Sequence, residues 1–185
     1  MGANGANAVF FLVTTLLDLA IWIWLLRILL QAARADFYNP ISQFIWQATR
    51  YPTDALQRVL PPWRNLNLAA ALGLLVIAVI HIHAVCGLLA LPVGALASVW
   101  YALLKITVMA VNLLTFTLFV QAILSWLGPG VNNPASNILW SLNEPLLRPV
   151  RRVLPVMSGL DLSPLLLILV LQVVNRLLPL PGVFR

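Results

Sequence analysis

Charged side chains are scarce in this sequence. Only 9% of its 185 residues are charged, and Asp and Glu together number five. Soluble globular domains carry about 25% charged residues. Hydrophobic residues make up 62% of the chain, and its mean hydropathy is +0.96. Such a chain cannot cover a surface that faces water, so the composition excludes a soluble domain and predicts a protein of the lipid bilayer.

Residues that carry common catalytic and metal chemistry are also missing. Cys86 is the single cysteine, which excludes an internal disulfide and a multi-cysteine metal site. His81 and His83 are two positions apart and fall on different faces of a helix, so they do not form a two-histidine site. The sequence has no Walker loop, GxSxG motif, HExxH motif or carboxylate pair. We therefore expect no enzyme, no catalytic residues, no cofactor and no metal.

Long stretches of the chain are free of charge. No formally charged side chain lies between Arg64 and Lys105, and only a short Pro-Gly turn interrupts that run. A span of about 20 apolar residues crosses a bilayer, and it must be helical because lipid offers backbone groups no partners. The sequence predicts four transmembrane helices, at residues 8–30, 66–91, 95–127 and 160–180. No Lys or Arg precedes Arg27, so the first is not expected to be a cleaved signal peptide.

One segment occurs twice. "NPISQFIW" begins at Asn39 and "NPASNILW" at Asn133, 94 positions later, and "RVLP" recurs at the same offset in 58–61 and 152–155. Matches at one fixed offset indicate an internal duplication. The predicted domains are residues 1–94 and 95–185, each a helix, an amphipathic connector (39–62 or 133–156) and a second helix. The predicted fold is thus an all-α membrane protein whose four transmembrane helices form two parallel repeats.

The arginines gather in the two connectors, whereas the hairpin between the second and third spans has no charge. The basic residues expected at the membrane surface are Arg58, Arg148, Arg151 and Arg152. By the positive-inside rule, both connectors face the cytoplasm and both termini the opposite side. The net charge of +6 then indicates orientation and binding of anionic lipid headgroups rather than of nucleic acid.

Each connector begins with the pattern of an amphipathic helix. The apolar positions of the first are Ile41, Phe44, Ile45 and Ala48, and the polar positions between them are Ser42, Gln43, Gln47 and Thr49. Helices of this kind lie in the membrane interface, with Trp46, Trp63 and Trp140 expected at headgroup depth. A docking surface for a partner protein and a re-entrant pore element remain as alternatives.

"ADFYNPISQFI", "LQRVLPPW" and "EPLLRPVRRVLP…GLDLSPLL" resemble the YggT family of small bacterial inner-membrane proteins. The resemblance covers nearly the whole chain, although the first copy has Tyr51-Pro52-Thr53 where Asn-Pro or Glu-Pro is usual. It implies a four-helix, multi-pass protein of the bacterial inner membrane that is associated with osmotic and envelope stress. In that membrane, the positive-inside rule predicts that both termini are periplasmic. Related proteins are linked to cytochrome maturation, nucleoid distribution and cell division. The family offers no established catalytic residues to carry over.

Four polar residues fall at one predicted depth, one in each span. They are Asp18, His81, Asn112 and Asn175. Counted at 1.5 Å per residue, each lies about 18–20 Å from the cytoplasmic end of its helix. The layer is predicted either to join the helices by hydrogen bonds or to form a cation or proton path, with Asp18 as acceptor and His81 titrating. We prefer the first interpretation.

Further charged residues lie near the ends of the spans. Arg27 and Asp161 are a possible interhelical pair near the cytoplasmic end, and the alternative is that Arg27 reaches the headgroups. Lys105 and Arg176 are expected to extend outward to the opposite membrane surface.

These features together predict a non-enzymatic accessory membrane protein whose interfacial helices bind lipid or a partner complex. Its expected partners are the bilayer and a membrane protein or further copies of itself. The alternative is a small ion channel or transporter for osmotic homeostasis, which would have to be a homo-oligomer because four helices are few for a pore.

Overall fold

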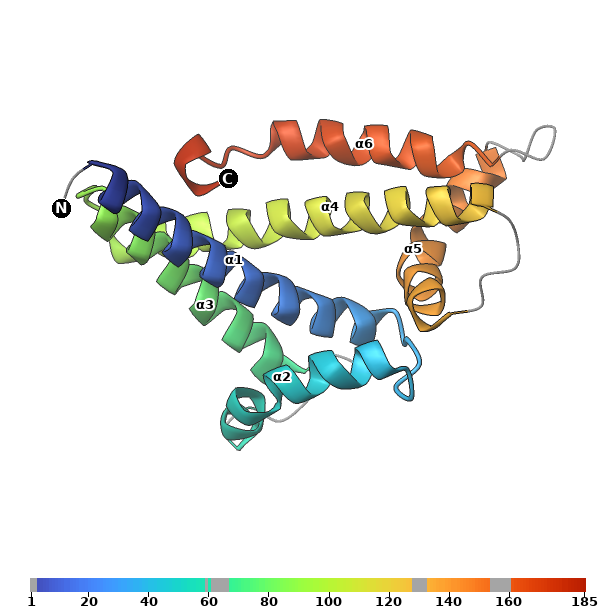
Figure 1. The fold of residues 1–185 in the computed structure, drawn as a ribbon, viewed down its shortest axis with the longest axis horizontal. Coiled ribbons are helices and arrows are strands. Elements are labelled where there is room, and N and C mark those ends of the chain that lie inside the picture. Colours follow the sequence, from blue (N-terminus) through green and yellow to red (C-terminus); the bar gives the residue numbers. More distant parts are fainter. Residues whose placement is uncertain (1–2, 59, 61–66, 128–132, 154–160) are drawn as a thin grey trace.

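The structure is a computed structural model that describes residues 3–58, 60, 67–127, 133–153 and 161–185. These residues are all-helical and contain no strand, as expected (Figure 1). The helices are α1 (Ala3–Ala32), α2 (Pro40–Gln57), α3 (Leu68–Leu88), α4 (Ala95–Leu127), α5 (Pro134–Val153), α6 (Ser163–Leu177) and the short 3-10 turn η1 (Gly182–Phe184).

Three helical segments of the described chain are long and apolar enough to cross a membrane. They are Asn4–Ala32, Leu68–Leu88 and Ala95–Ser125. The fourth predicted span is the apolar helix α6, which has 15 residues and is therefore about 22 Å long, shorter than a hydrocarbon core of about 30 Å. It ends at Leu177 because Pro179 and Pro181 follow closely and cannot continue a helix.

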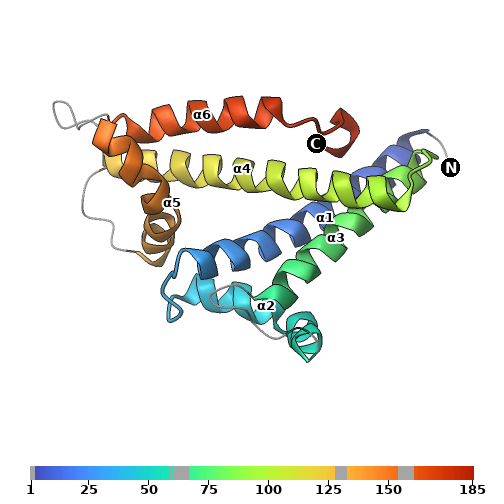
Figure 2. The same ribbon diagram turned by 180° about the vertical axis from the view of Figure 1, so that it is seen from behind.

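The long helices form two pairs. α1 lies along α3 and α4 lies along α6, and the first pair crosses α4 obliquely (Figures 1 and 2). The two chain ends lie at one end of these pairs. The shorter helices lie at the opposite end, where α2 packs against α1 and α3, and α5 packs against α4 and α6. Both connector helices are therefore on the same side of the molecule.

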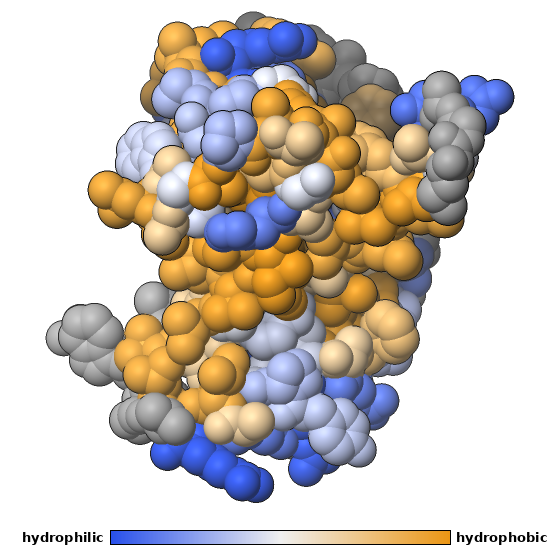
Figure 3. All heavy atoms as spheres, turned by 90° about the vertical axis from the view of Figure 1, so that its left-hand side faces the viewer, coloured by the Kyte–Doolittle hydropathy of each residue, from blue (hydrophilic) through white to orange (hydrophobic). Residues whose placement is uncertain are grey.

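The main core lies among α1, α3 and α4. Small residues of α3, including Ala70, Gly73 and Ala78, allow close approach to α1, and a Cβ atom at Gly73 would overlap the indole ring of Trp24. Apolar side chains also cover much of the outer surface, as the face that carries the chain ends shows (Figure 3). The exposed residues of α1 include Phe11, Leu12, Leu16 and Leu19. Large apolar surfaces of this kind are typical of contact with lipid.

Helix α2 presents three faces rather than the two predicted from the sequence. Asn39 caps it by accepting a hydrogen bond from the Ile41 N–H at 2.9 Å. The face toward α1 and α3 consists of Ser42, Ile45, Thr49 and Thr53, all buried. The prediction that Ser42 and Thr49 belong to a water-facing side is therefore wrong. Threonine can be buried here because its hydroxyl bonds the carbonyl of its own helix, as Thr53 does to Thr49 at 2.6 Å.

The other two faces of α2 are exposed. One is an apolar stripe of Ile41, Phe44, Ala48 and Tyr51, and the other carries Gln47, Arg50 and Asp54. Trp63, the start of the second predicted span at residue 66 and the connector residues 59, 61–62 and 154–156 lie outside the described part of the chain.

Candidate functional site

A charged cluster lies where α1, α3 and α4 meet. His81 Nε2 on α3 lies 3.1 Å from Asp18 Oδ1 on α1, so the structure brings these two predicted residues together. Lys105 Nζ on α4 lies 2.8 Å from the same oxygen. His81 and Lys105 are each 2% exposed, and the Asp18 side chain is 33% exposed. The cluster therefore joins three helices and pairs the carboxylate with a buried cation.

The prediction that Lys105 extends to the membrane surface is wrong. Its ammonium group is buried and also donates a hydrogen bond to the Phe184 carbonyl at 2.8 Å. Phe184 is itself buried and packs against the ring of Tyr101. The carboxylate and the carbonyl together satisfy the cation inside the protein, so Lys105 has no need to reach the headgroups. Arg176 is exposed, which is compatible with its predicted outward direction.

Asn112 and Asn175 form the second pair of the predicted polar layer. The Asn175 amide donates to Asn112 Oδ1 at 2.6 Å and thereby links α6 to α4. Arg185 donates to the Asn175 carbonyl at 3.0 Å. Phe184 and Arg185 are thus bonded to neighbouring parts of the polar layer, Phe184 to Lys105 of the charged cluster and Arg185 to Asn175.

Nearer the other end of the bundle, the connectors are bonded to the long helices. Arg27 Nη1 on α1 donates to Thr49 Oγ1 on α2 at 2.6 Å. The Asn143 amide on α5 donates to Gln121 Oε1 on α4 at 2.8 Å. Gln121 follows Arg27 by 94 positions, and Asn143 follows Thr49 by 94 positions. Equivalent positions of the two copies therefore make equivalent helix-to-connector contacts.

The predicted pair of Arg27 and Asp161 does not form. Asp161 Oδ2 contacts Arg151 at 2.9 Å, and Arg151 also contacts Glu144 at 2.8 Å. The reason is the packing: α1 lies against α2, α3 and α4, whereas Asp161 precedes α6, which lies against α4 and α5. Arg27 also does not reach outward, since it is 8% exposed.

The predicted surface arginines divide into two kinds. Arg58 at the end of α2 and Arg152 at the end of α5 are exposed. Arg148 has a 70% exposed side chain and pairs with Glu144 one helical turn earlier. Arg151 is half-buried and forms ion pairs with both Glu144 and Asp161. Of the four arginines it is therefore the one that links α5 to the residue before α6.

The two connectors touch at their first residues. The Asn39 side-chain amide donates to the Pro134 carbonyl at 2.6 Å, which joins the start of α2 to the start of α5. An apolar cluster of Leu30, Ile45, Ile138 and Leu142 also joins α1, α2 and α5. The duplicated sequence motifs therefore form one continuous surface at one end of the molecule.

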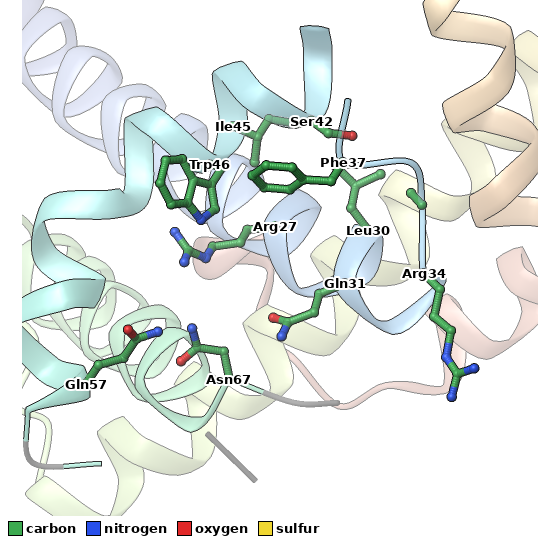
Figure 4. A pocket seen from close by; sticks show the side chains of 11 residues that line it. Arg27, Leu30, Gln31, Arg34, Phe37, Ser42, Ile45, Trp46, Gln57 and Asn67 are labelled. Atoms are coloured by element: carbon green, nitrogen blue, oxygen red, sulfur yellow. The ribbon is translucent and has the colours of Figure 1, made fainter. Parts of the chain in front are cut away.

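A cavity of about 370 Å³ lies beside this surface, between α1, α2 and Asn67, the N-cap residue of α3 (Figure 4). Its polar lining includes Arg27, Gln31, Gln57 and Asn67, and its apolar lining includes Trp46. No group of three His, Cys, Asp or Glu residues able to hold a metal ion occurs in the described chain.

Several of these contacts had no clear signal in the sequence. Thr49 and Asn143 look like ordinary polar positions of amphipathic helices, and Phe184 like a terminal residue. The signal that could have found Thr49 and Asn143 is the duplication. They lie 94 positions apart, and a buried hydrogen bond at one position suggests an equivalent bond at the other. Lys105 has Phe11 at its equivalent position, so the duplication could not indicate its role.

The fold and the site define a class: a helical protein with apolar membrane-crossing helices and an attached layer of amphipathic helices. The family model described as CCB3/YggT matches residues 6–87 and 100–181, and the chain belongs to this family. The two matched segments begin and end 94 positions apart.

Relatives of similar length are known from several bacteria. "Uncharacterized protein in proC 3'region" of Vibrio alginolyticus is 40% identical over 176 residues, 93% of this chain and 94% of that protein. "Uncharacterized protein YggT" of Escherichia coli strain K12 is 39% identical over 170 residues, 91% of this chain and 88% of that protein. A Pseudomonas aeruginosa relative is 35% identical over 174 residues, 92% of this chain and 88% of that protein. No solved structure matches the chain.

Proposed function

We propose that the chain is a non-enzymatic accessory protein of the bacterial inner membrane that contributes to osmotic and envelope stress tolerance. Its amphipathic helices α2 and α5 would bind lipid or a partner complex. The observation that carries this proposal is the joining of α2 to α5 through Asn39 and Pro134, with both helices anchored by buried bonds to α1 and α4. The stress role itself comes from the resemblance to the YggT family.

The proposed arrangement has four spans in two parallel repeats, residues 1–94 and 95–185. It is supported by pairs of equivalent contacts, since Asp18 with His81 and Asn112 with Asn175 are both pairs at the 94-residue offset. In this arrangement α6 is the fourth span, although it is short, and local thinning of the bilayer would accommodate it.

The proposed orientation places both connectors in the cytoplasm and both termini in the periplasm, because the arginines gather in the connectors. A reporter fused through a flexible linker after Arg185 is expected to be active only in the periplasm. A reporter inserted beside the exposed Asp54 is expected to be active only in the cytoplasm. Each fusion serves as the control for the other. A reporter after Arg185 that is active only in the cytoplasm, together with a reporter beside Asp54 that is active only in the periplasm, would overturn the proposed orientation.

The proposal places the apolar stripe of α2 in lipid and its charged face in water. Phe44 is 65% exposed in the protein alone, and Asp54 is also exposed, so only a membrane should distinguish them. In a Cys86→Ser background, Phe44→Cys is expected to react with a water-soluble maleimide about tenfold more slowly than Asp54→Cys in intact membranes. After denaturation both should react alike. Equal rates in membranes would rule out an interfacial α2.

The alternative function is a small ion channel or transporter. The polar cluster of Asp18, His81 and Lys105 within the long helices favours it, because intramembrane ionisable groups often mark ion paths. The pairing of Asp18 with Lys105 weakens it, since the carboxylate charge is already neutralised by a protein cation. Ion flux into liposomes that contain the purified protein would favour the channel, whereas absence of flux would favour the accessory role.

A further inference from the structure

The cavity between α1, α2 and the start of α3 contains a buried cation that forms no salt bridge with a described residue, although Asp54 on α2 is near enough to attract it electrostatically. Arg27 is 8% exposed, yet none of the described Asp or Glu residues forms a salt bridge with it. Its one side-chain bond in the described chain is the bond to Thr49. A guanidinium group has five N–H donors, and a buried charge without a counter-ion is costly. Asp54 is half-exposed and makes no direct contact with Arg27, so the guanidinium group still has donors available for an anion.

The other polar groups around the cavity are suited to the same anion. Gln31, Gln57 and Asn67 line it with side-chain amides, each of which has two N–H donors. In Figure 4 the Gln57 and Asn67 amides lie close to one another, and Arg27 lies next to Trp46. None of the described lining residues is acidic.

The second copy of the repeat shows what is different about this site. The residues 94 positions after Gln57 and Asn67 are Arg151 and Asp161, which form an ion pair at 2.9 Å. The residue 94 positions after Arg27 is Gln121, a neutral side chain bonded to Asn143. The second copy thus pairs the charges at these positions within the protein, whereas in the first copy Arg27 forms no salt bridge and the equivalent side chains are neutral amides.

The surroundings of the cavity suit an anion that is part of a lipid. Arg27 lies five residues before Ala32, the end of α1, so it is about 7–8 Å from that end. Phe37, Ile45 and Trp46 provide the apolar part of the lining, which suits the glycerol and upper acyl region of a phospholipid. A volume of about 370 Å³ lies within the usual range of small-molecule sites.

We propose that this cavity binds the phosphate group of an anionic phospholipid of the surrounding leaflet, with Arg27 as the charge partner and the amides of Gln57 and Asn67 as further donors. The apolar wall beside Trp46 receives the lipid's glycerol end. The inference rests on the proposed position of α2 at the membrane surface, and it adds a specific lipid site to the general attraction of the surface arginines.

The test measures phosphatidylglycerol retained by the purified full-length protein in native mass spectrometry, with phosphatidylcholine as the zwitterionic comparison. The unmodified protein is expected to retain one phosphatidylglycerol molecule in preference to phosphatidylcholine. Arg27→Gln introduces the residue found at the equivalent position 121 and is expected to lower retention about tenfold, since a charged hydrogen bond is lost. Arg148→Gln removes an exposed arginine and is the matched control, with an expected change of less than about twofold.

A second variant keeps the test decisive if Arg27→Gln does not fold. Asn67→Asp alone introduces the residue found at the equivalent position 161, and Asp can still cap α3, so it is expected to supply an internal anion and to displace the lipid while the protein stays folded. Retention of phosphatidylglycerol at the original level in a folded Asn67→Asp protein, or in a folded Arg27→Gln protein, would overturn the proposal.

Inorganic phosphate and glycerophosphate test the source of the anion. They are expected not to displace phosphatidylglycerol at millimolar concentration, and displacement by either would show a site for a free phosphate instead. Slow labelling of Phe44→Cys in membranes would still support the interfacial position of α2 if the protein did not retain phosphatidylglycerol. The lipid-site proposal can therefore be wrong while the proposed function stands.

Discussion

Lys105→Met is expected to remove most of the folded protein from the membrane. The substitution leaves the Asp18 carboxylate without the ammonium group now 2.8 Å away, in a region where lipid cannot replace it. Breaking a buried ion pair by removing one partner costs about 3–5 kcal/mol, and the lower value is expected here because Asp18 is partly exposed. The measurement is the amount of correctly inserted protein and its melting temperature after detergent extraction. Arg176→Met, which removes an exposed cation of α6, is the control and is expected to have little effect.

The double variant Lys105→Met with Asp18→Asn is expected to regain most of the lost stability. An amide at position 18 faces His81 without a charge, much as Asn112 faces Asn175 at the equivalent positions. Hydrogen bonds between membrane helices are worth about 0.6–2 kcal/mol, which is enough for this pair to keep its role in packing. A Lys105→Met protein as stable as the original, or a double variant no more stable than Lys105→Met, would contradict the pairing.

The same double variant separates the two functional interpretations of the polar cluster. If the cluster only joins helices, a folded protein with Asn at position 18 should still protect cells against osmotic stress. If it conducts a cation or proton, the loss of the carboxylate should abolish protection at unchanged protein level. We expect protection to persist, because the Asp18 carboxylate already forms an ion pair with Lys105 in the folded unmodified protein.

Counting positions along the chain identified partners within a repeat. Asp18 with His81 and Asn112 with Asn175 come from helices that lie side by side, so equal distances from one end place them at the same level. The same count failed for Lys105, because α1 and α3 cross α4 obliquely and equal counts on crossing helices do not give equal depth (Figure 1). Depth along a single helix is encoded locally, whereas the crossing angle depends on the packing of all the helices.

The connector helices show a second limit of sequence patterns. The apolar stripe of α2 was visible as a helical period, and Phe44 is indeed exposed on it. The buried face was not visible, because Ser42 and Thr49 carry polar hydroxyl groups. Thr49 is buried against Arg27, which lies 22 positions away in the chain. A pattern within one helix carries no information about such a contact.

Gly73→Ala is expected to lower the stability of the helix pair formed by α1 and α3. An added Cβ would overlap the indole ring of Trp24, which is buried against α3, so either the ring or the helix must move. Overpacking of a core costs about 1–3 kcal/mol. The expected result is a melting temperature several degrees lower for the purified protein, since about 1 kcal/mol shifts the melting temperature by roughly 2–4 °C in a chain of this size.

The matched control lies on the same helix. Gly87→Ala adds the same group where no atom lies within 4 Å, so it is expected to leave stability unchanged or to raise it by up to about 1 kcal/mol through helix propensity. The second copy suggests a rescue, because Leu118 and Leu167 occupy the positions equivalent to Trp24 and Gly73 and pack in one cluster. Trp24→Leu is therefore expected to restore stability to Gly73→Ala. Equal melting of Gly73→Ala and Gly87→Ala would show that α1 and α3 do not approach each other as closely as the structure indicates.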